Sequence, residues 1–346
     1  MRYVPVVDQD QTPLMPTTPS RAGRWIKTRK ATGFWKQGIY CVRLNVVPSG
    51  RVTQPIAAGV DPGSKREGFT LKSATHTYLN IQAEAVTQVS DKLKARREMR
   101  RGRRFRKTPY RKCRPNRGQA KAKGRIPPST HARWNAKLRT LKQVAKVFPV
   151  TDVVVEDIQA STRRRRKGKQ NKQGWNATFS PLQVGKAWFY VEIERAGWTL
   201  HLRQGYETKT LRDKWGLKKT SRKLDEKFEA HCVDSWALAN DVTGGHVTPD
   251  NTSLMVVKFL EPKRRQLHRF QPDKGGIRND RGGTASEGLV RGSLVVYKGR
   301  GLGILGGWTK VGLTINTLAG QPKYKAVKRA NIEFVAHNKW VTKYIK

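Results

Sequence analysis

The sequence has few cysteines, and none is spaced for a metal site or a disulfide framework. The three are Cys41, Cys113 and Cys232, and no Cys-X-X-Cys pair occurs, which argues against a zinc knuckle. No apolar run approaches the roughly 20 residues that a membrane-spanning helix needs, and the N-terminal residues lack the apolar core of a signal peptide. We therefore expect a protein of a reducing cytoplasm that does not use a membrane.

Acidic residues are also scarce. The chain of 346 residues has 25 Asp+Glu against 71 Lys+Arg, which gives a formal net charge of +46. Self-repulsion of this size opposes compaction, and a bound polyanion relieves it. A membrane surface is an alternative partner, but no basic segment has the continuous apolar face that insertion requires. The composition therefore favours a nucleic acid as the partner.

The order of expected elements predicts an α/β domain between two smaller modules. The first module has strands at 3–7 and 39–46, and a proline-bounded turn at 13–16. Three strands then form an antiparallel meander, at 56–60, 69–71 and 78–84. Helices and strands alternate beyond it, with helices at 130–148, 181–196 and 228–242 and strands at 152–158 and 198–204. After residue 245, short strands at 254–259 and between 294 and 337, joined by glycine-rich turns, indicate a separate β domain.

Two segments are dominated by Lys and Arg. The first segment spans 90–125. Ser90 and Asp91 can cap a helix at its start, and Pro109 should end that helix. Such runs are often solvated tails, but this one lies between folded segments, and guanidinium groups bind phosphate bidentately. A second basic loop spans 161–174. The expected RNA or DNA contacts are Arg96, Arg97, Arg100, Arg101, Arg103, Arg104, Arg106, Lys107, Arg163, Arg164, Arg165 and Arg166.

Two carboxylates lie where apolar strands are expected to end. Asp61 follows the apolar strand 56–60, and Pro62 and Gly63 turn the chain away from it. Glu156 ends the run of valines at 153–155. Because side chains alternate along a strand, only one of Glu156 and Asp157 can face the same side as Asp61. We choose Glu156.

A third carboxylate comes from a predicted helix. His231 and Asp234 are three positions apart and therefore share one helical face. Together with Asp61 and Glu156 they would supply the hard oxygen ligands that Mg²⁺ or Mn²⁺ prefers. Two such ions can activate water and stabilise the leaving oxygen of a phosphodiester, with Asp61 bridging them and His231 orienting or deprotonating the water. Taken singly, each residue has an ordinary alternative, such as a turn-forming Asp before Pro-Gly.

The ordered segments resemble the three split parts of a RuvC-type, RNase H-like nuclease domain. The Arg-rich helix after the first part resembles the bridge helix of RNA-guided effectors. Pro-Leu-Met-Pro at 13–16 resembles the motif that names the first domain of the transposon-encoded IscB group. IscB-type proteins carry an HNH nuclease between the second and third RuvC parts, but only 75 positions separate Glu156 from His231 here, and no His-Asn-His cluster lies among them. In this respect the chain resembles proteins of the IsrB type, which lack the HNH nuclease.

The resemblance implies an ordered set of domains. They are a PLMP domain at 1–54, RuvC segment I at 55–89, a bridge helix and basic linker at 90–126, RuvC segment II at 127–160, a basic loop with RuvC segment III at 161–245, and a β-rich domain at 246–346 that interacts with a target-adjacent motif (TAM). It also implies a prokaryotic, cytoplasmic protein, monomeric within a ribonucleoprotein, whose guide is an ωRNA. Its target would be double-stranded DNA with a TAM, nicked on the non-target strand with two Mg²⁺ ions.

A RuvC-like junction resolvase would need neither the PLMP module nor so basic a bridge helix, and is therefore disfavoured. Two other interpretations stay open at this point. A relative of the TnpB type would cut both strands with one RuvC site, although such chains usually carry a C-terminal zinc ribbon that three scattered cysteines cannot form. A basic RNA-binding protein without catalytic activity would use the same carboxylates structurally. Mg²⁺-dependent cleavage that is lost in Asp61→Ala, with binding retained, separates the enzymes from the binding protein.

Overall fold

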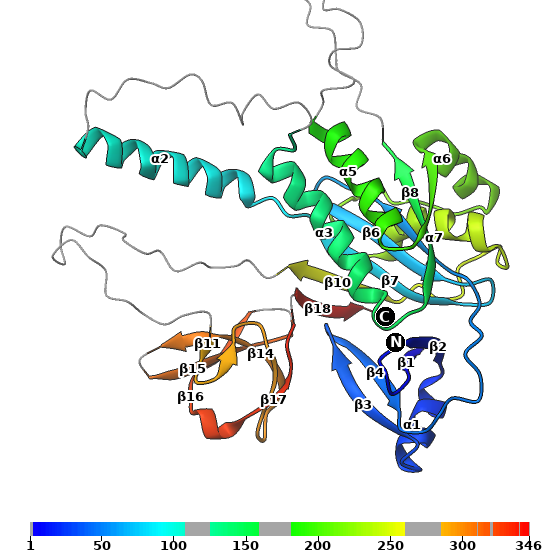
Figure 1. The fold of residues 1–346 in the computed structure, drawn as a ribbon, viewed down its shortest axis with the longest axis horizontal. Coiled ribbons are helices and arrows are strands. Elements are labelled where there is room, and N and C mark those ends of the chain that lie inside the picture. The colour runs from blue at the N-terminus through cyan, green and yellow to red at the C-terminus, as the bar shows by residue number, and fades with distance from the viewer. Residues whose placement is uncertain are drawn as a thin grey trace, which may run out of the picture.

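The chain forms a central α/β domain flanked by two β-rich modules (Figure 1). In this computed structural model, the described residues are 3–107, 125–158, 181–259, 285–309, 311–318, 321–338 and 340–345. The expected basic loop at 161–174, with Arg163 to Arg166, lies outside them. Among the described residues, no helix is long and apolar enough to cross a membrane.

The central sheet has seven strands in the order β18-β10-β7-β6-β5-β8-β9. The predicted antiparallel meander is present as β5 (Ile56–Asp61), β6 (Arg66–Lys72) and β7 (Thr77–Glu84). Next to β5 lie two parallel strands, β8 (Val150–Asp157) and β9 (Thr199–Gln204). The order β7-β6-β5-β8-β9, with these directions, is that of an RNase H-like sheet. The expected mixed α/β class is confirmed.

Two further strands extend this sheet beyond β7. Parallel to β7 lies β10 (Leu254–Phe259), and antiparallel to β10 lies β18 (Trp340–Ile345). The sequence pattern placed β10 in a separate C-terminal domain, and β18 was not expected. Alternating residues of β10 are buried on both faces, with Met255 in the main core and Leu254 against the opposite helix. Burial on both faces is what joins this strand to the central sheet.

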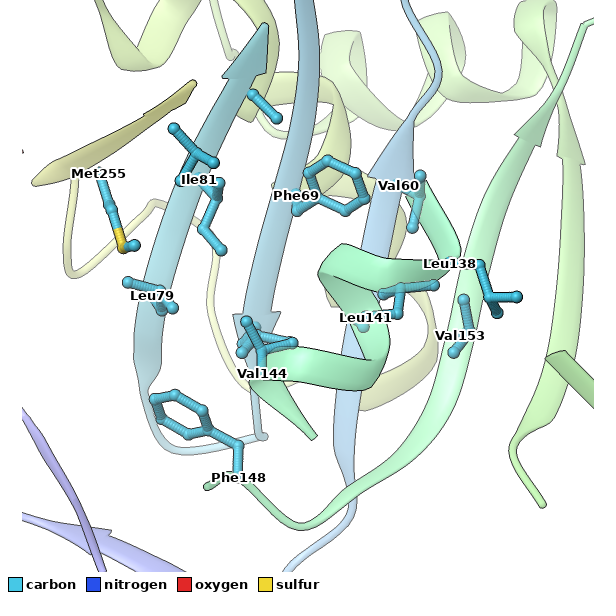
Figure 2. Packing of buried hydrophobic residues seen from close by; sticks show 14 of the residues in the cluster. Val60, Phe69, Leu79, Ile81, Leu138, Leu141, Val144, Phe148, Val153 and Met255 are labelled. Carbon is cyan, nitrogen blue, oxygen red and sulfur yellow. The ribbon is translucent and has the colours of Figure 1, made fainter. Parts of the chain in front are cut away.

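Helices cover both faces of the sheet. On one face, α3 (Pro128–Val144) and α5 (Pro181–Arg195) pack over the main core. Figure 2 shows Leu138, Leu141 and Val144 of α3 against side chains of the strands. The other face is covered by α7 (Phe228–Thr243).

Glycines allow α7 to approach the sheet closely. A Cβ on Gly59 of β5 would lie 1.8 Å from the carbonyl oxygen of Ser235, and one on Gly68 of β6 would lie 2.4 Å from the carbonyl oxygen of His231. Both glycines therefore let the helix backbone rest directly on the strands. The ammonium of Lys72 then donates to the carbonyl of Gly244 at 2.7 Å, just beyond the helix C-terminus. These contacts set the position of every side chain on α7.

The N-terminal module has its own four-stranded sheet in the order β2-β1-β4-β3. Its elements are β1 (Val4–Val7), β2 (Pro13–Thr17), α1 (Pro19–Lys27), β3 (Ala31–Lys36) and β4 (Ile39–Leu44). The turn predicted at 13–16 was wrong, because these residues form β2. An edge strand tolerates proline, since its outer N–H groups need no partner in the sheet. Thr18 caps the helix that follows.

The basic helix predicted after residue 90 is present as α2 (Val89–Lys107). It extends away from the central sheet (Figure 1), and Met99 is 55% exposed. Such exposure leaves most of the described helix surface without protein packing. Pro109, expected to end the helix, lies outside the described residues.

The C-terminal module is a second β structure. Its five-stranded antiparallel sheet has the order β16-β15-β14-β13-β17. The elements are β11 (Ala285–Ser286), β12 (Leu289–Val290), β13 (Leu294–Tyr297), β14 (Gly301–Thr309), β15 (Gly312–Asn316), β16 (Pro322–Val327), η3 (Arg329–Asn331) and β17 (Ile332–Ala336). The core of this module is separate from the main one.

Candidate carboxylate site

Strand alternation brings Asp61 and Glu156 to the same face of the sheet. Along β5 and β8, Ala57 and Val154 pack against α7, whereas Val60 and Val155 enter the main core on the opposite face. Asp61 and Glu156 continue the α7 side of this alternation. Val60 pairs with Val155, so the two carboxylates follow side by side on adjacent parallel strands.

The neighbouring Asp157 belongs to the other face. Its carboxylate accepts hydrogen bonds from the Tyr190 hydroxyl at 2.8 Å and from Gln204 Nε2 at 3.1 Å, and it pairs with Lys186. Burial raises the pKa of Asp157, but the hydrogen bonds from Lys186 and Tyr190 outweigh burial and leave the pKa below its ordinary value. These contacts tie Asp157 to α5. The choice of Glu156 as the carboxylate on the Asp61 side agrees with this geometry.

From the helix, α7 adds His231 and Asp234. Both are buried, at 7% and 2% exposure, and their spacing of three residues places them over the sheet beside Asp61. The ring nitrogen Nε2 of His231 donates to the carbonyl of Lys223 at 2.9 Å. Nδ1 is therefore the nitrogen that faces Asp61 Oδ2, at 3.4 Å. The structure thus brings together all four residues that the sequence pattern selected.

Two cationic side chains contact the carboxylates. Arg212 Nη1 donates to Asp234 Oδ1 at 2.7 Å, and Lys219 donates to Asp234 Oδ2. The same ammonium lies 3.7 Å from Asp61 Oδ2. Arg212 comes from α6 (Gly205–Lys214), a helix that was not expected, and Lys219 from the segment between α6 and α7. Gln204 and Glu207 form a capping box at the start of α6. Gln is not a usual N-cap residue, so the standard N-cap signature does not mark this helix in the sequence.

Burial and the proximity of several carboxylates both shape the electrostatics of the site. Burial raises the pKa of Glu156 to about 7, with further contributions from the Asp61 and Asp234 charges and from a hydrogen bond with Asp61. Burial lowers the pKa of Lys219, but the surrounding carboxylates Asp61, Asp234 and Glu156 outweigh burial and raise it above its ordinary value. The raised pKa of Lys219 shows that the three carboxylates together favour a cation at this place.

The chemistry of these side chains suits a hard divalent cation such as Mg²⁺. Three carboxylates converge from two strands and a helix, and oxygen ligands of this type are those that Mg²⁺ binds. Within the described part of the chain, however, no three His, Cys, Asp or Glu side chains form a ready metal group. Asp61 and Asp234 are paired with Lys219 instead. A metal ion would therefore have to take the place of the Lys219 ammonium.

A second, basic surface lies outside this site. Arg96, Arg97, Arg100 and Arg101 are exposed on α2. The backbone of Arg103, Arg104, Arg106 and Lys107 continues the same helix, and their side chains lie outside the description. The helix therefore presents cationic side chains that do not contribute to the carboxylate site.

Comparison with known proteins finds a family model that matches the first part of the chain. Residues 4–175 match the model of the family described as RRXRR protein, and Arg100-Arg101-Gly102-Arg103-Arg104 in α2 has the pattern that this name spells. The match spans just under half of the chain. No curated protein sequence matches the chain.

The chain also has a likeness to a solved structure. This is T. thermophilus RuvC in complex with Holliday junction substrate, at 14% identity and a TM-score of 0.30. The match covers 56% of this chain and 98% of the RuvC chain.

Proposed function

We propose that this protein is an RNA-guided DNA endonuclease of the IsrB type, which nicks the non-target strand with a single RuvC-like site. The observation that carries the proposal is the convergence of Asp61, Glu156 and Asp234 on one face of an RNase H-like sheet, in a chain of net charge +46. A protein this basic has little reason to gather three carboxylates unless they bind cations.

Two Mg²⁺ ions bound there would supply an activated water and a stabilised leaving oxygen, with Mn²⁺ as the alternative. Asp61, Glu156 and Asp234 would hold them, with Asp61 shared. Lys223 fixes the ring of His231 through its carbonyl, so Nδ1 is presented toward Asp61. That nitrogen can accept a proton from water at the site. Lys219 and Arg212 balance the carboxylates before the ions bind.

The basic helix α2 would hold the guide RNA. Its described arginines are exposed, and the helix itself extends from the protein body (Figure 1), which suits contact with phosphates on more than one side. Base pairing between guide and target supplies the sequence specificity, so the protein needs only backbone contacts and a short flanking motif. We assign reading of that TAM to the C-terminal module. The proposed domain boundaries are 54, 89, 126, 160 and 245, except that β10 and β18 of the last segment belong to the central sheet.

We expect a single cut because the stretch of chain between Glu156 and His231 is short. In the described part of this interval, α5, β9 and α6 occupy the chain, and all three belong to the central domain. A second nuclease domain has no place among them. One carboxylate site cutting one strand gives a nick, whereas the TnpB-like alternative predicts that the same site cuts both strands.

Plasmid cleavage tests the proposal. The copurifying RNA is sequenced, and a supercoiled plasmid with the matching target is incubated with the complex in Mg²⁺. Asp61→Ala, Glu156→Ala and Asp234→Ala should abolish nicking and keep RNA binding. Asp157→Asn is the matched control, because that carboxylate faces α5, and it should still nick. Full activity of Asp61→Ala would refute the site, and RNA binding without any Mg²⁺-dependent cleavage would leave a binding protein.

A further inference from the structure

A pocket of about 540 Å³ lies where the three β structures of the chain meet. Its walls come from β3 and the turn after it, from β18 of the central sheet, and from β13 to β16 of the C-terminal module with their connecting turns. The walls that matter here are Trp35, Arg300, Leu302, Lys323, Tyr324 and Tyr344. We call this the junction pocket. Its volume lies in the range of roughly 300–1,000 Å³ that small-molecule sites occupy.

Hydrogen bonds hold the walls of the junction pocket together. Trp340 Nε1 donates to the Gln37 carbonyl at 2.6 Å, and the Tyr344 hydroxyl donates to the Gly38 carbonyl at 2.9 Å. Gly38 has φ +80°, and a Cβ there would lie 2.5 Å from Thr342 Oγ1. Only glycine fits this close approach. The N-terminal module is therefore fastened to β18 at a defined place, and the pocket is formed without a ligand.

The chemistry of the pocket is aromatic and cationic. Tyr324 is half-buried and packs edge-on against Tyr297 at 5.1 Å. The Arg300 guanidinium lies 6.0 Å and the Lys323 ammonium 5.2 Å from the Tyr324 ring centre. Leu302 and Tyr344 are each 41% exposed beside it. None of the described residues that line the pocket is acidic, and Arg300, Lys323 and Lys343 make its lining positive. This charge disfavours a cation as the ligand and favours a flat group bearing negative charge.

We propose that the junction pocket binds one unpaired nucleotide of the RNA that this protein carries, with the base against Tyr324 and the phosphates at Arg300 and Lys323. The choice of RNA as the partner rests on the proposed function. Folded RNA presents unstacked bases in loops and bulges, and proteins bind these on aromatic side chains. Lys343 also lines the pocket, but its ammonium is paired with Glu226 at 2.7 Å, so Arg300 and Lys323 are the phosphate partners.

The position of the pocket separates it from the carboxylate site. It is built on β18, the edge strand, whereas Asp61 and Glu156 lie on β5 and β8, with β10, β7 and β6 in between. The junction pocket and the carboxylate site are therefore separate sites on the sheet. The junction pocket anchors RNA to the N-terminal and C-terminal modules together.

Binding in EDTA tests this proposal without cleavage. The full chain, stripped of RNA in high salt, is titrated with an oligoadenylate RNA of about 12 nucleotides and with the same ribose-phosphate chain lacking bases. The ratio of the two Kd values measures the contribution of the bases. Tyr324→Ala should reduce that ratio by about tenfold, as expected for the loss of one base stack. An unchanged ratio overturns the proposal.

Two matched pairs of variants guard against misfolding. Leu302→Trp fills the pocket and should reduce the ratio as Tyr324→Ala does, whereas Val311→Trp, at a 76% exposed site outside it, should not. Lys323→Glu should weaken binding of both probes more than Lys325→Glu, because Lys325 is exposed and does not line the pocket. Equal effects within either pair contradict the assignment.

A parallel titration with DNA decides whether the pocket binds RNA or DNA. If the effect of Tyr324→Ala on oligodeoxyadenylate equals or exceeds its effect on RNA, assignment to the RNA is overturned. The assay is independent of nicking. If the protein nicks but Tyr324→Ala leaves the Kd ratio unchanged, only the pocket assignment is overturned. If Tyr324→Ala reduces the ratio but the protein does not nick, only the proposed function is overturned.

Discussion

Replacing Lys219 with Gln should make the metal-free protein less stable and its response to Mg²⁺ stronger. Lys219 pairs with Asp234 and lies 3.7 Å from Asp61. If the carboxylates are a metal site, the ammonium occupies the place of the ion. Its removal leaves uncompensated negative charge in EDTA, and it also removes the group that Mg²⁺ must displace.

The geometry sets the size of both effects. Breaking a fully buried ion pair costs about 3–5 kcal/mol. The Lys219 side chain is 27% exposed and that of Asp234 is 3% exposed, and Arg212 remains with Asp234, so we expect about 2 kcal/mol. At roughly 2 °C per kcal/mol for a large chain, Tm falls by about 4 °C. The same free energy makes apparent Mg²⁺ affinity about 30-fold tighter in the variant.

Thermal unfolding in EDTA and across a Mg²⁺ series measures both quantities. Lys218→Gln is the matched control, because Lys218 is the exposed neighbour, and it should behave as the unmodified protein does. If Lys219→Gln and the unmodified protein gain the same stability from Mg²⁺, the carboxylates and Lys219 form a structural ion-pair cluster and not a metal site.

Three further predictions follow from the same structure. Burial and the nearby carboxylates raise the folded-state pKa of Glu156 from 4.5 to about 7, so its stabilisation is complete below pH 4.5 and is lost as pH rises through 7. In EDTA, the Tm of the unmodified protein relative to Glu156→Gln should therefore fall between about pH 5 and pH 8, and a constant difference contradicts the pKa shift. Gly59→Ala should destabilise by about 3 kcal/mol in chemical unfolding, because its Cβ meets the Ser235 carbonyl. Gly23→Ala, with open space around it in α1, should stabilise by about 0.5–1 kcal/mol. Changing Arg96, Arg97, Arg100 and Arg101 to Gln should weaken RNA binding and flatten its dependence on salt, and an unchanged salt slope in filter binding refutes the role of α2.

The parts of the carboxylate site that follow a local period could be predicted from the sequence. Alternation along β8 separates Glu156 from Asp157, and the three-residue step on α7 joins His231 to Asp234. Lys219 and Arg212 could not be found in this way. In a chain with 71 Lys+Arg, no spacing distinguishes two cations that meet a carboxylate only after α6 and α7 have packed.

The fold shows the same division between local and long-range information. The meander β5–β7 was predictable, because its strands follow one another directly. Membership of β10 in the central sheet was not, because an apolar strand pattern does not say which strands it pairs with, and the partners β7 and β18 lie far away in the chain. Pro13 and Pro16 suggested a turn because prolines usually interrupt strands, and only the edge position of β2 makes them compatible with pairing.

Guided cleavage of a supercoiled plasmid tests the central claim most directly. The complex with its copurified RNA is given Mg²⁺ and a plasmid that carries the matching target, beside the Asp61→Ala complex. Our account predicts an open-circle product cut only on the strand displaced by the guide, and no product from Asp61→Ala. A linear product, or an open circle that persists in Asp61→Ala, would contradict it.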